Sequence, residues 1–174
     1  MTDQTFALST IYKGWESYQR RLVRMIAPLS AEHLMVPVGA HHWTVGMVVQ
    51  HLLGDRVWWF HLWMGEGSAD LAPIIAWNPA EEQHGPPINN AAELVTALES
   101  TWQMIATALT RWTPSDLEHV FSPPSSLSEA EQQAFGDTPR DWILWHVLEH
   151  EIHHGGELSV ALGAQGLPGI YGRA

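Results

Sequence analysis

The chain has 174 residues, of which 45% are hydrophobic, and its 19 acidic residues against eight basic ones give a formal charge of −11. Length and composition allow one well-buried core, so we expect a single domain over residues 1–174. The lack of cysteine excludes disulfides, thiolate metal sites and a cysteine nucleophile, and the acidic balance argues against nucleic-acid binding, which needs clustered lysine and arginine.

Two amphipathic helices are predicted in the first third of the chain. Apolar residues recur every three or four positions over about residues 5–27, and Pro28 closes this segment. The same spacing over about 44–63 predicts a second helix. Thr44 is a good N-cap for it, and Gly65 marks its end.

The rest of the chain predicts two more helices and two long connections. Residues 64–89 are rich in proline and glycine and read as a connection, and 90–111 form the third helix. A loop is predicted over 122–137, and the last helix runs from about Pro139 to Leu162. No segment alternates as a half-buried strand does, so the expected fold is an all-α four-helix bundle with short extra helical turns in its loops.

The last helix carries four histidines within nine residues. On a helix all four share one face; they are His146, His150, His153 and His154. His150 and His154 lie one turn apart, a spacing that lets two imidazoles bind one metal ion. Residues 150–154 also spell H-E-x-x-H, the pattern of zinc proteases.

A catalytic zinc-type site usually takes three ligands, so we expect a third from upstream, on another helix. The 20 residues after His154 contain no histidine, the extended peptidase pattern is absent and no sheet is predicted, so a peptidase is not expected. His51 lies mid-helix on an apolar face and is the best candidate. His61 lies nearly three turns further on, about 15 Å away, too far to share the ion. His41 and His42 precede the helix and could line the mouth of the site.

Two segments resemble patterns of the DinB superfamily. WTVGMVVQHLLGDRVWW is similar to its second helix with one central histidine, and TPRDWILWHVLEHEIHHGGELSVAL to its last helix. The resemblance implies an up-down-down-up four-helix bundle that binds a divalent ion, commonly zinc or nickel, through His51, His150 and His154. Where many members have Arg-Gly-Gln after the last ligand, residues 155–157 are Gly-Gly-Glu, so recognition of an anionic group by that arginine is in doubt here.

The resemblance also implies a class of reaction. Several members look like transferases or isomerases that use a low-molecular-weight thiol such as bacillithiol, mycothiol or glutathione, and homodimers are common. We therefore expect a metal-dependent thiol transferase or isomerase, or a small-molecule hydrolase, acting on an apolar electrophile. A non-catalytic metal-binding or stress-related bundle protein remains the alternative.

Several side chains near the predicted ligands have more than one interpretation. Three neutral imidazoles would leave a position where a bound water or thiol becomes a nucleophile near pH 7. Glu151 could take the proton as a catalytic base, or it could be a supporting or surface carboxylate. Asp55 could orient a ligand histidine or form a salt bridge. His146 and His153 could be spare ligands, proton shuttles or packing residues, and the tryptophans of both helices could fill the core or wall an apolar pocket.

The remaining expectations concern location and partners. No run approaches the 18 apolar residues of a membrane span, and the first residues lack the basic and apolar regions of a secretory signal. A cytoplasmic protein with a small-molecule substrate is therefore expected, with no nucleic-acid or membrane partner.

Overall fold

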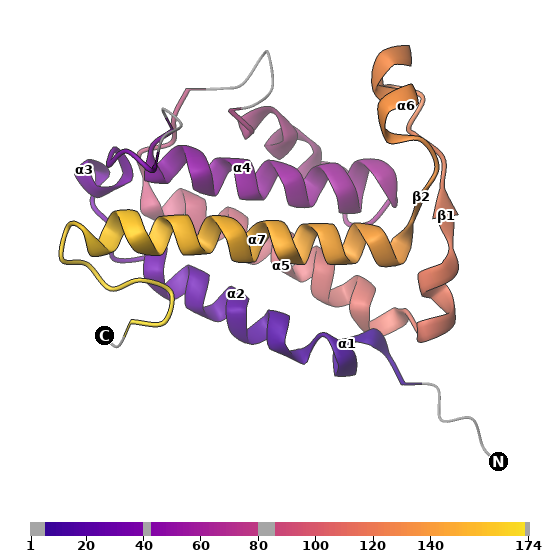
Figure 1. Ribbon diagram of the computed structural model, residues 1–174, viewed down its shortest axis with the longest axis horizontal. Coiled ribbons are helices and arrows are strands. Elements are labelled where there is room, and N and C mark those ends of the chain that lie inside the picture. Colours follow the sequence, from indigo (N-terminus) through magenta and orange to yellow (C-terminus); the bar gives the residue numbers. More distant parts are fainter. Residues whose placement is uncertain (1–5, 40–42, 80–85, 173–174) are drawn as a thin grey trace.

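The computed structural model describes residues 6–39, 43–79 and 86–172. The chain is mostly helical, as predicted, and four long helices lie side by side (Figure 1). They are α2 (Lys13–Ile26), α4 (Val45–Val57), α5 (Ala91–Arg111) and α7 (Arg140–Gly163). Helix α4 packs against both α5 and α7, and α2 packs against α5. Among the described residues, none of the helices combines the length and the apolar character that a membrane crossing requires.

The predicted helix boundaries follow from local capping. The Thr44 side chain accepts a hydrogen bond from the Met47 amide at the start of α4, and Asn90 caps α5 in the same way. The first predicted helix is divided at Tyr12 into α1 (Leu8–Ile11) and α2. Short helical turns also form in the connections, as expected; they are α3 (Ala31–Leu34) and η3 (Pro114–Glu118).

The second predicted helix changes character near its end. After α4 the chain continues as a π-helix, η1 (Trp58–Trp63), in which five of six residues carry rings. Trp59 and Trp63 are both buried, and their ring centroids lie 5.0 Å apart. Gly65 then ends the helix with a φ of 70°, a conformation that favours glycine.

Both predicted connections contain regular structure. Residues 64–89 include a 3₁₀ helix, η2 (Ala69–Trp77), which packs along α4. The predicted loop 122–137 contains α6 (Glu129–Phe135), started by a reciprocal capping box between Ser128 and Glu131.

The expectation that the chain has no sheet needs a small correction. β1 (Val120–Phe121) and β2 (Thr138–Pro139) pair antiparallel beside α7, with Val120 opposite Pro139. Two residues per strand are too few to produce a visible alternation in the sequence.

A buried ion pair joins the four long helices. The Arg56 Nε on α4 donates to the Glu151 Oε1 on α7 over 2.7 Å, and both side chains are almost completely buried. Trp15 of α2 donates to the second carboxylate oxygen over 2.9 Å. The guanidinium also donates to the side chains of Gln19 on α2 and Thr101 on α5. Because a buried charge is costly unless it is paired and hydrogen-bonded, this network fixes how the helices sit against one another.

Replacing Arg56 by methionine should therefore be strongly destabilising. The variant leaves the Glu151 carboxylate buried without a counter-charge, and we expect a loss of about 3–5 kcal/mol in the free energy of unfolding. The double variant Arg56→Met/Glu151→Leu should recover much of that loss, because no buried charge remains. Urea denaturation measures both.

The matched control is Arg20→Ala, which removes the exposed ion pair with Glu16. It should cost no more than about 1 kcal/mol. An Arg56→Met protein as stable as this control would show that the buried pair does not hold the bundle together.

Candidate metal centre

Three histidines converge between α4 and α7. The Nε2 atoms of His51 and His150 lie 2.9 Å apart, and those of His150 and His154 lie 3.2 Å apart. One ligand atom from each of the three lies within 4.8 Å of the others. The structure thus brings together the three residues that were predicted from the sequence as metal ligands. Two lie on α7 and one lies on α4.

Two of the rings have a defined tautomer. The Nδ1 of His51 is 2.8 Å from the Asn78 Oδ1, and the Nδ1 of His154 is 2.6 Å from the Glu157 Oε2. Both partner oxygens can only accept, so each Nδ1 carries a proton and donates it. A neutral ring protonated at Nδ1 has its lone pair at Nε2. The lone pairs of His51 and His154 therefore point into the cluster.

The third ring faces a buried carboxylate. The Nδ1 of His150 lies 3.4 Å from the Asp55 Oδ2, and neither atom has a hydrogen-bond partner among the described residues. Burial, reinforced by the neighbouring His51 and His154, lowers the pKa of His150 to about 3. Burial and the charge of Glu151 raise the pKa of Asp55 to about 8. His150 is therefore neutral at pH 7 and available as a ligand.

This arrangement fits a divalent cation. Lone pairs that face one another at 2.9–3.2 Å repel unless a proton or a cation lies among them. A cation would accept all three and would favour the ionised form of Asp55, whose oxygen would then receive the His150 N–H. Imidazole ligands suit zinc and nickel among the common divalent ions.

Glu151 lies elsewhere, and the geometry does not support its predicted role as a base. Its two carboxylate oxygens accept hydrogen bonds from Arg56 and Trp15 inside the bundle. The reason is geometric: successive helical residues point about 100° apart, so the residue after His150 faces the core. The carboxylates that do contact the ligand rings are Asp55 and Glu157.

The other histidines that the structure describes do not join the cluster of three. His146 stacks on Trp142, and its Nε2 is 4.0 Å from the Asp55 Oδ1. His153 is largely exposed beside Glu157. His61 bonds to the Glu66 carbonyl. The expectation that residues 41–42 could line the mouth falls outside the described residues.

Two of the residues in Gly-Gly-Glu, 155–157, have a defined structural role. The Tyr18 hydroxyl donates to the Glu151 carbonyl over 2.8 Å, and a Cβ built on Gly155 would lie 1.9 Å from that hydroxyl oxygen. Only glycine leaves room for this contact. The carboxylate at the third position orients His154. Neither this role of Glu157 nor the participation of Asn78 was predicted from the sequence.

Comparison with known proteins places the fold. The sequence profile described as the DinB family matches residues 1–170. The chain belongs to the DinB family. Among solved structures, the chain is similar to a DinB-like protein from Bacillus cereus ATCC 10987, with 21% identity, coverage of 95% of this chain and 98% of that one, and a TM-score of 0.68. At that identity the likeness concerns the fold alone. No curated protein matches.

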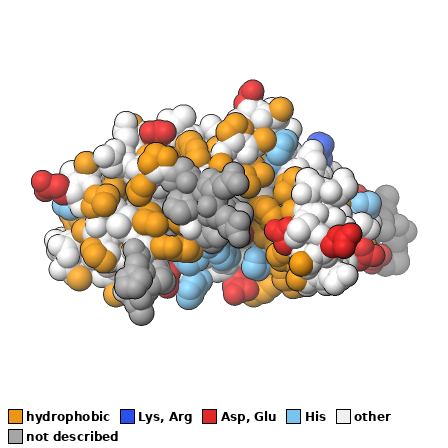
Figure 2. Space-filling view, turned by 90° about the horizontal axis from the view of Figure 1, so that it is seen from above, with side chains coloured by type: hydrophobic (Ala, Val, Ile, Leu, Met, Phe, Trp, Pro, Cys, Tyr) orange, Lys and Arg blue, Asp and Glu red, His pale blue; other side chains and the backbone are white. Residues whose placement is uncertain are grey.

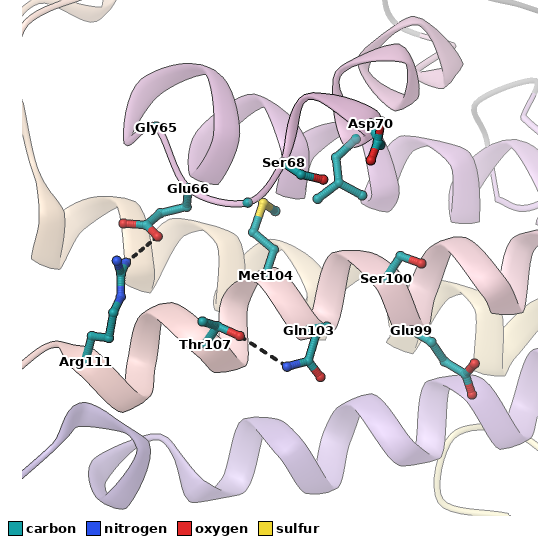
Figure 3. Close-up of a pocket in the computed structure, with 12 residues that line it drawn as sticks. Gly65, Glu66, Ser68, Asp70, Glu99, Ser100, Gln103, Met104, Thr107 and Arg111 are labelled. Carbon is teal, nitrogen blue, oxygen red and sulfur yellow. Dashed lines mark hydrogen bonds and ion pairs between the residues drawn. The ribbon is translucent and has the colours of Figure 1, made fainter.

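A separate cavity lies away from the histidines. Its volume is about 800 Å³, and it lies between the turn Gly65–Asp70 and one face of α5 (Figure 3). Glu66 and Arg111 form an ion pair at one end, and Met104 reaches in from α5. Its lining contains no imidazole. This cavity is therefore not part of the histidine cluster.

The contact between Gly155 and Tyr18 can be tested with two neighbouring alanines. Gly155→Ala should destabilise the protein by about 1–3 kcal/mol, the usual cost of an overpacked core. Gly156→Ala is the matched control, because nothing lies within 4 Å of its Cβ and alanine is the better helix former. Thermal unfolding of the two variants gives the comparison, and equal stabilities would contradict the packing described above.

Because Asn78 and Glu157 orient the rings of His51 and His154, the affinity for metal should depend on both side chains. Asn78→Ala removes the acceptor of His51, and Glu157→Gln replaces the carboxylate that accepts from His154. Each should weaken the tightest metal-binding step about 10–100-fold, the usual effect of losing such a partner. Competition with a chromophoric zinc chelator measures this step. Unchanged affinity in both variants would mean that these contacts do not support the ligands.

Proposed function

We propose that this DinB-family protein is a divalent-metal-dependent enzyme. The observation that carries the proposal is the convergence of three imidazoles, each with its other ring nitrogen facing a side-chain oxygen. Within the described residues this group has three protein ligands, the number typical of catalytic sites, which keep a position for water or substrate. A divalent ion held there supplies Lewis-acid chemistry, which lowers the pKa of a water or thiol placed beside it.

The reaction we propose is transfer of a low-molecular-weight thiol to an apolar electrophile. The chain has no cysteine, so any thiol comes from a cosubstrate. The thiol sulfur forms a bond to an electrophilic carbon, the leaving group departs with its electron pair, and the thiol proton goes to solvent. Zinc or nickel is the proposed ion, and hydrolysis of a small molecule by water at the same position is the variant of this proposal.

A small aromatic pocket beside the site supports an apolar substrate. It has a volume of about 230 Å³. Its lining includes Asp55 and Asn78, the side chains that contact His150 and His51. The rest of its wall is mainly aromatic and comprises Trp58, Trp59, Phe135 and His146, with Glu131 at the side.

We also propose the up-down-down-up helix order that the family implies. In support, η2, which follows α4 and precedes α5 in the sequence, packs along α4. Helix α4 also packs on α5. A chain that returns along α4 before it starts α5 makes these two helices parallel. The cytoplasmic location and the homodimer stay predictions from the sequence.

The first test is metal content. Untagged wild-type protein should contain about one divalent ion per chain, measured by elemental analysis after exhaustive dialysis. His51→Ala and His150→Ala should each lose it, because the two imidazoles that remain hold an ion less tightly than three and release it during dialysis. His119→Ala, which removes an exposed histidine from another part of the fold, is the control. Retention of the ion in His51→Ala would refute the three-histidine site.

The second test is turnover. Metal-loaded protein, glutathione or bacillithiol, and an activated aromatic halide should give loss of free thiol that is faster than in buffer and absent in His150→Ala. Turnover that is equal in the two proteins would reject the transferase. Bound metal without turnover over a panel of thiols and electrophiles would instead favour the non-catalytic metal-binding protein.

A further inference from the structure

We propose that α7 carries a second, outer site for a divalent transition metal, formed by His153 and Glu157. It is distinct from the cluster of His51, His150 and His154, which uses Nε2 atoms inside the bundle. The existence of the outer site needs only the two surface side chains. The effect of the outer site on the affinity of the inner site for its ion rests on the proposed function.

The geometry comes from one turn of helix. His153 and Glu157 are four residues apart on α7, and the His153 Nε2 lies 3.5 Å from the Glu157 Oε1. Ligand atoms of His153, His154 and Glu157 all lie within 4.8 Å of one another. The His153 side chain is 64% exposed and that of Glu157 is 27% exposed, so an ion can reach them from solvent. Figure 2 shows that, on the face viewed from above, histidine side chains reach the surface with acidic side chains nearby.

The two oxygens of Glu157 face different partners. Oε2 accepts the His154 N–H over 2.6 Å, and Oε1 faces His153. One carboxylate can therefore support an inner ligand through one oxygen and bind an outer ion through the other. An imidazole nitrogen and a carboxylate oxygen one turn apart suit zinc, nickel or copper, with water in the remaining positions.

The shared carboxylate couples the two sites. An ion at Oε1 withdraws electron density from Glu157, which weakens its hold on the His154 N–H and so the basicity of that ligand. The two cations also repel each other through a partly buried path. Filling the outer site should therefore lower the affinity of the inner one, and by reciprocity the inner ion weakens the outer. Excess metal would then act as an inhibitor of the inner site.

The alternative for these side chains is a simple surface ion pair between His153 and Glu157. Such a pair forms no strong site, and it predicts a single metal equivalent per chain. The number of bound ions therefore separates the two interpretations.

The test is a titration of metal-free protein with Zn²⁺ by calorimetry. Wild type should bind two equivalents, one tight and one weaker. His153→Ala should bind only the tight equivalent, and His119→Ala, which removes an exposed histidine outside the cluster, should still bind two. Circular dichroism checks that each variant is folded.

Two results would overturn the outer site: one equivalent in wild type at saturating Zn²⁺, or a second equivalent that survives in His153→Ala. These differ from failure of the inner site, which shows as a tight step that survives His51→Ala. If the outer site exists, its loss in His153→Ala should also remove the inhibition of thiol transfer by excess Zn²⁺. Inhibition that persists in this variant would refute the coupling.

Discussion

The buried ion pair between Arg56 and Glu151 sets the geometry on which the metal centre depends. Arg56 lies five residues after His51 on α4, and Glu151 directly follows His150 on α7. Because the carboxylate and the guanidinium meet inside the bundle at 2.7 Å, the two helices are held in one register. That register brings the Nε2 of His51 to within 2.9 Å of the Nε2 of His150. The same pair of helices, α4 and α7, therefore carries both the core network and the histidine cluster.

Side chains around the three rings also help to position the candidate ligands. On the far side of the three imidazoles lie oxygens of Asn78, Asp55 and Glu157, of which Asn78 and Glu157 form hydrogen bonds with their rings. An amide and two carboxylates differ in how strongly they raise the basicity of a ligand, so the three rings are not equivalent donors. Glycine at residue 155 belongs to this arrangement, since it admits the Tyr18 hydroxyl next to the last ligand. Residues 155–157 therefore shape the surroundings of His154, through the space left at Gly155 and the carboxylate of Glu157.

The parts of the fold that are local in sequence could be predicted, and the parts that depend on another element could not. Spacing and caps predicted the four long helices, and the distance of one turn between His150 and His154 predicted two ligands on one face. The π-helix that begins at Trp58 could not be distinguished from an α-helix by the spacing of its apolar residues. Asn78 lies in the connection after α4, and nothing in its own segment indicates that it meets His51. The capping box of α6, Ser128 with Glu131, was present in the sequence and was not recognised.

Glu151 shows how a sequence motif can suggest a role that the packing of the helices does not support. Its place inside H-E-x-x-H suggested a catalytic base, because that is the role of the glutamate where the motif binds zinc in peptidases. The motif does not state which way the residue faces, and its partner Arg56 lies on a different helix. Only the packing of α4 against α7 shows that the carboxylate is engaged in the core.

The most direct test of the three-imidazole centre is X-ray absorption spectroscopy at the zinc edge, on protein loaded with one equivalent of zinc. Three histidine ligands predict a first coordination shell of nitrogen and oxygen, with outer-shell scattering that requires three imidazoles. A shell that fits one imidazole or none, or oxygen ligands alone, would contradict the assignment of His51, His150 and His154 as the ligands.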